Sequence, residues 1–151
     1  MKILVLSGTN LNLLGEREPE VYGTVTLAEI HERVRERAAE LGVEVRCLQS
    51  NHEGELLDAL HAARGDCAAV VLNPGALAHT SVALRDAIAA LRIPVVEVHL
   101  TNVYARQAEP FRRRLVLAPV VRGVIMGFGP ESYILGLEAA VRLVREQEGS
   151  R

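Results

Sequence analysis

Short apolar runs alternate with longer helix-period segments along the whole chain, and this alternation constrains the fold more than any other feature. Runs typical of strands occupy residues 3–6, 43–47, 68–72, 95–100 and 124–126. Segments with apolar residues three and four apart occupy residues 26–41, 53–63, about 80–91 and 130–146. Because strands and helices take turns, the sequence predicts an α/β fold, with a parallel sheet between two helical layers (a three-layer αβα arrangement).

The second apolar run differs from the others. Val43, Val45 and Cys47 alternate with charged residues, which is typical of a strand with one exposed face, whereas the other four runs indicate buried strands. An edge position for the second strand predicts the order 2-1-3-4-5, a flavodoxin-like doubly wound five-stranded parallel sheet. Thr26-Leu-Ala-Glu29 is a capping box, so the first helix is predicted to begin there. Pro130 is typical of the first turn of the last helix.

Length and composition limit the organisation of the chain. Its 151 residues match one core, so we expect a single domain over residues 1–151. A net charge of -2 argues against a nucleic-acid or membrane-surface binder. No apolar run approaches the roughly 18 residues of a membrane span, and the first run is too short for a signal peptide. Cys47 and Cys67 are far apart and are expected to be buried thiols in a reducing, cytoplasmic compartment.

Polar residues follow three of the strands, at the edge where parallel sheets bind ligands. Asn10 follows the first strand, Asn73 and His79 follow the third, and Glu97 and His99 end the fourth. The long connections over residues 7–25 and 101–119 add Arg17, Tyr22, Arg106 and Arg112. Each has a structural alternative: the Asn residues could form turns, Glu97 could pair with a backbone group, and the arginines could be solvated. Their convergence on one edge favours a functional site.

Missing residues exclude several kinds of chemistry. Lys2 is the only lysine and begins the first strand, away from the predicted site, which argues against a Schiff-base enzyme. The phosphate-binding Gly-x-x-x-x-Gly-Lys loop, the dinucleotide-binding Gly-x-Gly-x-x-Gly turn and the Gly-x-Ser-x-Gly nucleophile elbow are absent. Two separated histidines without an acidic or thiolate cluster do not make a metal site. We therefore expect no metal site.

The remaining side chains suit proton transfer on a polyhydroxylated anion. Arginine and asparagine can hold a carboxylate and hydroxyls, and histidine can act as a general acid. Tyr22 can act as a base only if its phenolate is stabilised by about 4 kcal/mol, because its pKa must fall close to neutrality. A guanidinium about 4 Å away supplies that order of energy at an effective dielectric constant of about 20. Arg17 and Arg106 are the candidates.

The chain resembles the type II 3-dehydroquinate dehydratases over essentially its full length, and four segments carry the resemblance. They are residues 8–23 (GTNLNLLGEREPEVYG), 49–55 (QSNHEGE), 73–86 (NPGALAHTSVALRD) and 97–102 (EVHLTN). The resemblance implies a metal-free and cofactor-free anti elimination of water from 3-dehydroquinate. The reaction passes through an enolate, gives 3-dehydroshikimate, and belongs to the shikimate route to aromatic amino acids or to quinate breakdown.

The resemblance also implies roles for the site residues. Tyr22 would remove the proton next to the ketone, and Arg17 would hold it ionised on a mobile lid of about residues 8–25. Asn10 would stabilise the enolate through a bound water, and His99, oriented by Glu97, would protonate the departing hydroxyl. The implied substrate-binding groups are the side chains of Asn73, His79, Arg106 and Arg112, the backbone amides of Leu100 and Thr101, and Asp86. Asp86 would reach a neighbouring subunit's site in a trimer-based homo-oligomer, typically a dodecamer.

The sequence departs from the family's pattern in two places. Ser7-Gly8-Thr9 stands where the family usually has Asn-Gly-Pro. The stretch 107–115 is longer than usual, which leaves open whether Arg112 or Arg113 contacts the substrate. Two other functions on this fold also stay open: a flavodoxin-like module that binds flavin or another phosphate ligand, and an inactive assembly or regulatory protein.

Overall fold

The computed structural model describes residues 1–151, apart from the side chain of Tyr22. Its centre is a parallel sheet in the order β2-β1-β3-β4-β5, as predicted. The strands are β1 (Lys2–Ser7), β2 (Glu44–Gln49), β3 (Ala69–Asn73), β4 (Val95–His99) and β5 (Gly123–Met126).

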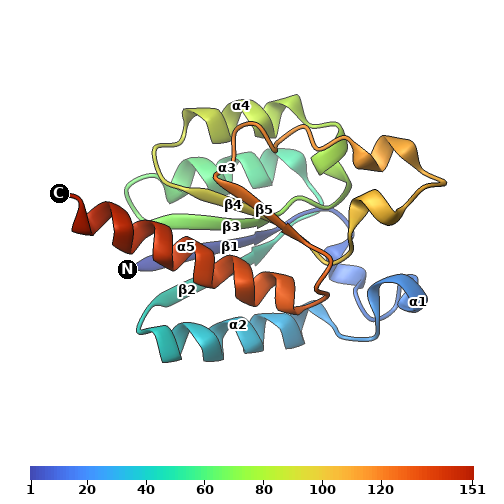
Figure 1. Ribbon diagram of the computed structural model, residues 1–151, viewed down its shortest axis with the longest axis horizontal. Coiled ribbons are helices and arrows are strands. Elements are labelled where there is room, and N and C mark those ends of the chain that lie inside the picture. The colour runs from blue at the N-terminus through green and yellow to red at the C-terminus, as the bar shows by residue number, and fades with distance from the viewer.

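Helices cover both faces of the sheet, which confirms the three-layer arrangement (Figure 1). One face carries α2 (Leu27–Leu41) and α5 (Glu131–Gly149), and the other carries α3 (Glu53–Ala63) and α4 (Val82–Ala90). Successive residues of β1 point to opposite faces, so Ile3 packs with the first pair of helices and Leu4 with the second. This double burial explains why the central strands have continuous apolar runs.

Local hydrogen bonds set where the helices begin. The Thr26 hydroxyl accepts a hydrogen bond from the Glu29 amide at 3.2 Å, and the Glu29 carboxylate accepts one from the Thr26 amide at 3.3 Å. The predicted capping box is therefore present. In α4 the cap is Ser81, whose hydroxyl accepts from the Leu84 amide at 2.9 Å, so this helix begins slightly later than expected. Pro130 is the cap of α5 and lies just before its first helical residue.

Two burial expectations were wrong. β5 was expected to be buried, but it is the second edge of the sheet and is half-buried, because no strand covers its outer side. Cys47 was also expected to be buried. It is only half-buried because β2 lies at the other edge, whereas Cys67 is 5% exposed. Both thiols are free.

Short helices occupy the two long connections, where sequence periodicity gave no signal. Residues 8–25 contain the 3₁₀ helix η1 (Leu11–Leu13) and α1 (Pro19–Tyr22), and residues 101–119 contain η3 (Val103–Ala105) and η4 (Pro110–Arg113). Both connections lie at the carboxyl edge of the sheet, next to the last residues of β1 and β4 (Figure 1).

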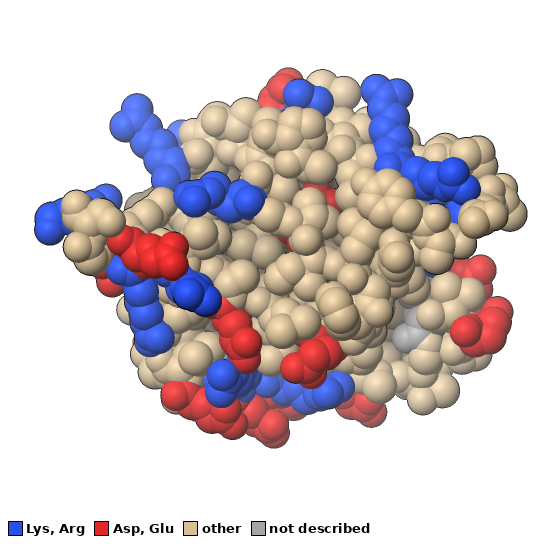
Figure 2. Space-filling model, in the orientation of Figure 1, with Lys and Arg blue, Asp and Glu red and all other residues tan. Residues whose placement is uncertain are grey.

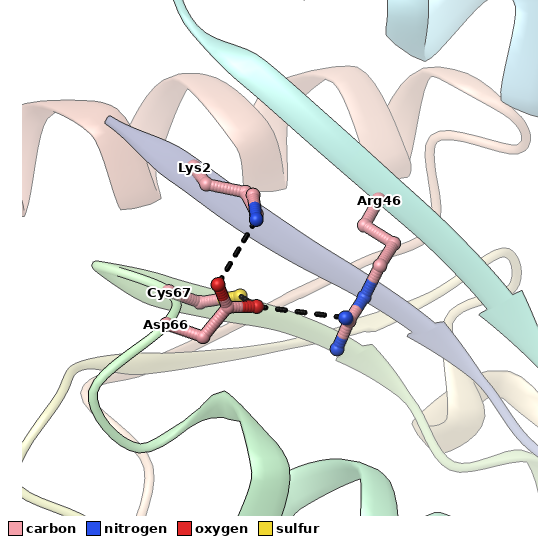
Figure 3. Close-up of polar contacts among 4 residues, drawn as sticks. All are labelled: Lys2, Arg46, Asp66 and Cys67. Atoms are coloured by element: carbon pink, nitrogen blue, oxygen red, sulfur yellow. Dashed lines mark hydrogen bonds and ion pairs between the residues drawn. The ribbon is translucent and has the colours of Figure 1, made fainter.

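A polar cluster occupies the opposite, amino edge of the sheet (Figure 3). The Asp66 carboxylate lies 3.0 Å from the Lys2 ammonium and 3.5 Å from the Arg46 guanidinium, and the Cys67 thiol is 3.8 Å from it. The hydrogen bond from Lys2 lowers the pKa of Asp66, and burial raises the pKa of Cys67. Exposed ion pairs of this kind add little stability. Lys2 is thus paired with Asp66 far from the carboxyl edge.

Among the described residues, no helix has the length and apolar character needed to span a bilayer.

Candidate active site

The loops after β1 and β3 touch at the carboxyl edge of the sheet, and two glycines allow this contact. A Cβ atom on Gly8 would lie 2.5 Å from the Pro74 carbonyl oxygen, and one on Gly75 would lie 2.6 Å from the Thr9 carbonyl oxygen. Gly75 also has a φ of +63°, which L side chains rarely adopt. The Gly8 amide donates a 2.8 Å hydrogen bond to the Asn73 carbonyl. This close approach brings the residues that follow β1 beside the end of β3.

A cavity of about 80 Å³ opens at this junction. Its walls combine apolar and polar residues. They are formed by Thr9, Asn10, Leu11, Leu14, Arg17, Asn73, Gly75, Ala76, His79, His99, Leu100, Thr101, Val103, Arg106 and Arg112. Of these lining residues three are arginines and none is acidic, so the cavity favours an anionic ligand. Figure 2 shows basic side chains at the end of the molecule that carries η3 and η4, and others at the opposite end.

Glu97 and His99 form a buried pair at the end of β4. They are two residues apart, so both side chains lie on the same face of the strand. Nε2 of His99 lies 2.5 Å from Oε2 of Glu97, whose side chain is 0% exposed. Oε1 of Glu97 has no hydrogen-bond partner among the described residues. Because Nε2 faces the carboxyl group, Nδ1 of His99 is the ring nitrogen left for proton transfer in the cavity.

Asn10 adopts the left-handed conformation, with a φ of 66°. The loop after β2 holds it there: the Asn10 amide donates a 2.9 Å hydrogen bond to Oδ1 of Asn51. Gln49 braces the same loop by donating to Oδ1 of Asn51 at 3.1 Å and to the Gly8 carbonyl at 3.2 Å. Sequence reasoning assigned no role to Gln49 or Asn51. Gln49 is the last residue of β2 and Asn51 follows the strand, and their place in one of the resembling segments was the available signal.

Asn73 and His79 line the cavity from the β3 side. Asn73 is 3% exposed, and its Oδ1 accepts a hydrogen bond from the Gly75 amide at 3.1 Å. Nδ1 of His79 lies 2.9 Å from the Arg114 carbonyl oxygen. Burial lowers the pKa of His79, and the nearby charges of His99 and Arg112 act in the same direction. A neutral His79 donates from Nδ1 to the carbonyl, which leaves Nε2 as an acceptor.

One carboxylate connects two of the cavity's arginines. Oε2 of Glu109 lies 3.5 Å from Nη1 of Arg106, and Oε1 lies 3.1 Å from Nε of Arg112. Glu109 belongs to the long stretch 107–115 and was not singled out from the sequence. Arg112 lines the cavity, whereas Arg113 is exposed and does not. Of the two arginines left open by the sequence, the geometry favours Arg112.

The other predicted site residues lie at several places around the cavity. Arg17 lines it from the 8–25 segment, and one guanidinium nitrogen lies 3.5 Å from the Glu18 carboxylate. Tyr22 is the last residue of α1, but its side chain lies outside the part that the structure describes, so its role as a base stays a prediction. Leu100 and Thr101 line the cavity directly after β4. Asp86 is exposed on α4 and does not line the cavity.

Two further observations bear on ligands. The Thr9 hydroxyl, which sequence reasoning overlooked, lines the cavity with a buried oxygen that has no partner among the described residues. No group of three or more His, Cys, Asp or Glu side chains suited to a metal ion occurs in the described part of the chain.

Comparisons with known proteins agree with this geometry. The family model described as dehydroquinase class II matches residues 1–141. A protein of Desulforudis audaxviator named 3-dehydroquinate dehydratase is 56% identical over 151 residues, covering 100% of this chain and 99% of that protein. One of Pelotomaculum thermopropionicum with the same name is 58% identical over 143 residues, covering 95% of this chain and 98% of that protein.

Solved structures give the same result. The type II dehydroquinase of Butyrivibrio crossotus superposes with a TM-score of 0.90 at 40% identity, covering 93% of this chain and 97% of that one. The type II dehydroquinase of Propionibacterium acnes superposes with a TM-score of 0.88 at 40% identity, covering 93% of this chain and 96% of that one. The chain belongs to the class II dehydroquinase family.

Proposed function

We propose that this protein is a type II 3-dehydroquinate dehydratase, which converts 3-dehydroquinate to 3-dehydroshikimate by anti elimination of water. The observation that carries the proposal is the meeting of Asn10, Arg17, Asn73, His79 and His99 at one arginine-rich cavity. Family membership over residues 1–141 supports the same reaction. The substrate is a small carboxylate with several hydroxyls, which suits a cavity that has cationic and amide groups but no acidic lining residue.

Substrate binding follows from the kinds of group around the cavity. The backbone amides of Leu100 and Thr101, at the end of β4, receive the carboxylate. Asn73 and the neutral His79 hold ring hydroxyls. Asn73 does so through its carboxamide, and His79 through Nε2, which is an acceptor. Arg106 and Arg112 supply positive charge, and the Glu109 carboxylate bridges their two guanidiniums.

The reaction then needs two proton transfers. Tyr22, as a phenolate, takes the proton from the carbon next to the ketone, and the electrons of that C–H bond form the enolate. Asn10 stabilises the enolate oxygen through a bound water. When the enolate collapses, the C–O bond on the other side breaks, and His99 gives its proton to the departing hydroxyl so that water leaves. Glu97 supports the positive charge of His99 before this transfer, which its 2.5 Å contact makes possible.

Arg17 has the task of keeping Tyr22 ionised. It belongs to the same 8–25 segment and lines the cavity, so it moves with Tyr22 if this segment acts as a lid. Arg106 approaches from the opposite connection and adds to the positive potential. Together, two guanidiniums supply more than the roughly 4 kcal/mol of electrostatic stabilisation that the phenolate requires.

The reaction belongs to the shikimate route to aromatic amino acids or to quinate breakdown. Two free cysteines fit a reducing, cytoplasmic setting. The two rival functions are not favoured, since neither a flavin- or phosphate-binding module nor an inactive assembly protein requires the whole set of acid–base groups at this cavity.

We also propose a homo-oligomer built from trimers, typically a dodecamer, in which Asp86 completes a neighbouring subunit's site. The exposure of Asp86 and its position outside its own subunit's cavity support this. Light scattering should give a mass near twelve subunits. Mixed oligomers of inactive Tyr22→Phe and Asp86→Ala subunits should recover activity, because some sites then receive both intact residues. A monomer in solution would reject the assembly.

The direct test of function is an absorbance assay. Purified protein mixed with 3-dehydroquinate should produce the ultraviolet absorbance of a conjugated enone, and neither chelator nor borohydride should stop it. Tyr22→Phe should abolish turnover while circular dichroism stays unchanged, and Tyr104→Phe, an exposed tyrosine outside the cavity lining, is the matched control. Wild-type rates in Tyr22→Phe would reject the assigned base, and an inactive but well-folded wild-type oligomer would reject the reaction.

A further inference from the structure

A buried hydroxyl network lies directly behind the cavity. Tyr133, on the sheet-facing side of α5, is 0% exposed, and its hydroxyl lies 2.9 Å from Oγ of Ser7, which is also 0% exposed. The same phenol is hydrogen-bonded to the side chain of Asn73. Ser7 and Asn73 are register partners at the ends of β1 and β3. Three elements that are distant in sequence therefore meet at one phenolic oxygen, and only Asn73 among these residues reaches the cavity.

The hydrogen bonds determine which way the Asn73 carboxamide faces. Its oxygen accepts from the Gly75 amide, and its hydrogen bond to Tyr133 lowers the pKa of the phenol, as an N–H that donates to the phenol oxygen does. The nitrogen is therefore the end that faces the phenol. The Tyr133 O–H then donates to Ser7. A carboxamide nitrogen carries two hydrogens, so one is used by the phenol and the other remains available to a ligand in the cavity.

If this network served only to pack the core, it would lower the stability of the fold, because its buried hydroxyl groups lose their contacts with water. A phenylalanine in α5 would fill nearly the same space in the apolar cluster around Tyr133 without a hydroxyl to desolvate. Burial also raises the pKa of Tyr133 to about 12, so the phenol keeps its proton at neutral pH and remains a donor.

We propose that Tyr133 is a positioning residue, which together with Ser7 holds the Asn73 carboxamide in the one orientation that offers an N–H to a substrate hydroxyl. The inference rests on the proposed dehydratase function and deepens it, since it concerns how the same site recognises its substrate. Tyr133 does not touch the substrate, and its effect passes through Asn73.

Steady-state kinetics of Tyr133→Phe test this. Asn73 would bind the substrate and the transition state alike, so losing its orientation should raise KM about 10-fold while kcat stays within about 2-fold. Ser7→Ala should shift KM in the same direction by a smaller factor, because the phenol keeps its bond to Asn73. Tyr104→Phe, which removes an exposed hydroxyl, should change neither constant.

A double-mutant comparison separates positioning from general loosening of the core. In an Asn73→Ala background, Tyr133→Phe should have no further effect on KM, because the group that it positions is gone. An unchanged KM in Tyr133→Phe, or a KM increase that persists in full in the Asn73→Ala background, would overturn the inference. Absence of turnover by the wild-type protein would instead reject the proposed function, so the two failures are distinguishable.

Discussion

Replacing Gly136 by alanine sets two measurable effects against each other. Gly136 is a buried residue inside α5, next to Val98 of β4 and Val71 of β3. Alanine is the better helix former by about 1 kcal/mol, which alone would stabilise the protein. However, an added Cβ would lie 2.6 Å from Cγ1 of Val98 and 3.1 Å from Cγ1 of Val71. Favourable carbon–carbon contacts need about 3.5–4.0 Å, so the nearer pair overlaps by about 1 Å.

The overlap should prevail. Val98 and Val71 are both 0% exposed, and a β-branched side chain in a packed sheet cannot rotate away cheaply. Overpacking of this kind costs about 1–3 kcal/mol, and the upper part of this range applies because two side chains are affected. After the helix gain is subtracted, Gly136→Ala should lower the free energy of unfolding by about 1–2 kcal/mol. For a chain of this size that corresponds to a Tm lower by about 2–8 °C.

Urea denaturation at constant protein concentration measures the difference. The matched control is Gly54→Ala in α3, where an added Cβ meets nothing within 4 Å, so stability should rise by about 0.5 kcal/mol. Combining Gly136→Ala with Val98→Ala should cost less than the sum of the two single changes, since the clashing methyl group is removed. If Gly136→Ala were as stable as the wild type or more so, the inferred clash would be absent.

Three further predictions concern the site and its surroundings. Glu97→Gln keeps a hydrogen-bond acceptor beside its histidine but removes the charge, so kcat should fall about 10-fold or more with KM little changed; an unaltered kcat would contradict the pairing. Asn51→Ala deprives the left-handed Asn10 of its backbone partner and should lower kcat about 10-fold in the same assay, with far-ultraviolet circular dichroism unchanged. Burial and the charge of Arg35 lower the pKa of His31. The unfolded chain then binds more protons, so Tm should be steady above about pH 6.5 and fall below it. His31→Gln should flatten that fall, whereas the exposed His61→Gln should not.

Local sequence patterns determined the order and type of the main elements. Burial on both faces produces continuous apolar runs and burial on one face produces alternation, so the sequence identified the central strands and placed β2 at an edge. The capping box at Thr26 and Glu29 works in the same way, because both partners lie within one turn of helix. The pattern failed at β5, since a short apolar run has no feature that distinguishes an edge strand from a central one.

The sequence also indicated the functional residues of the site, because the carboxyl ends of the strands in a doubly wound sheet lie at one edge. Asn10, Asn73 and His99 needed only the strand order to be brought together. Only the tertiary structure decided what holds them: Asn51 is 41 residues from Asn10 in sequence, and Tyr133 is 126 residues from Ser7. No local pattern marks such a partner. In the sequence, a buried tyrosine within an apolar helix stripe has the same pattern as any other core residue, and only the fold defines the hydrogen-bond partner of its hydroxyl.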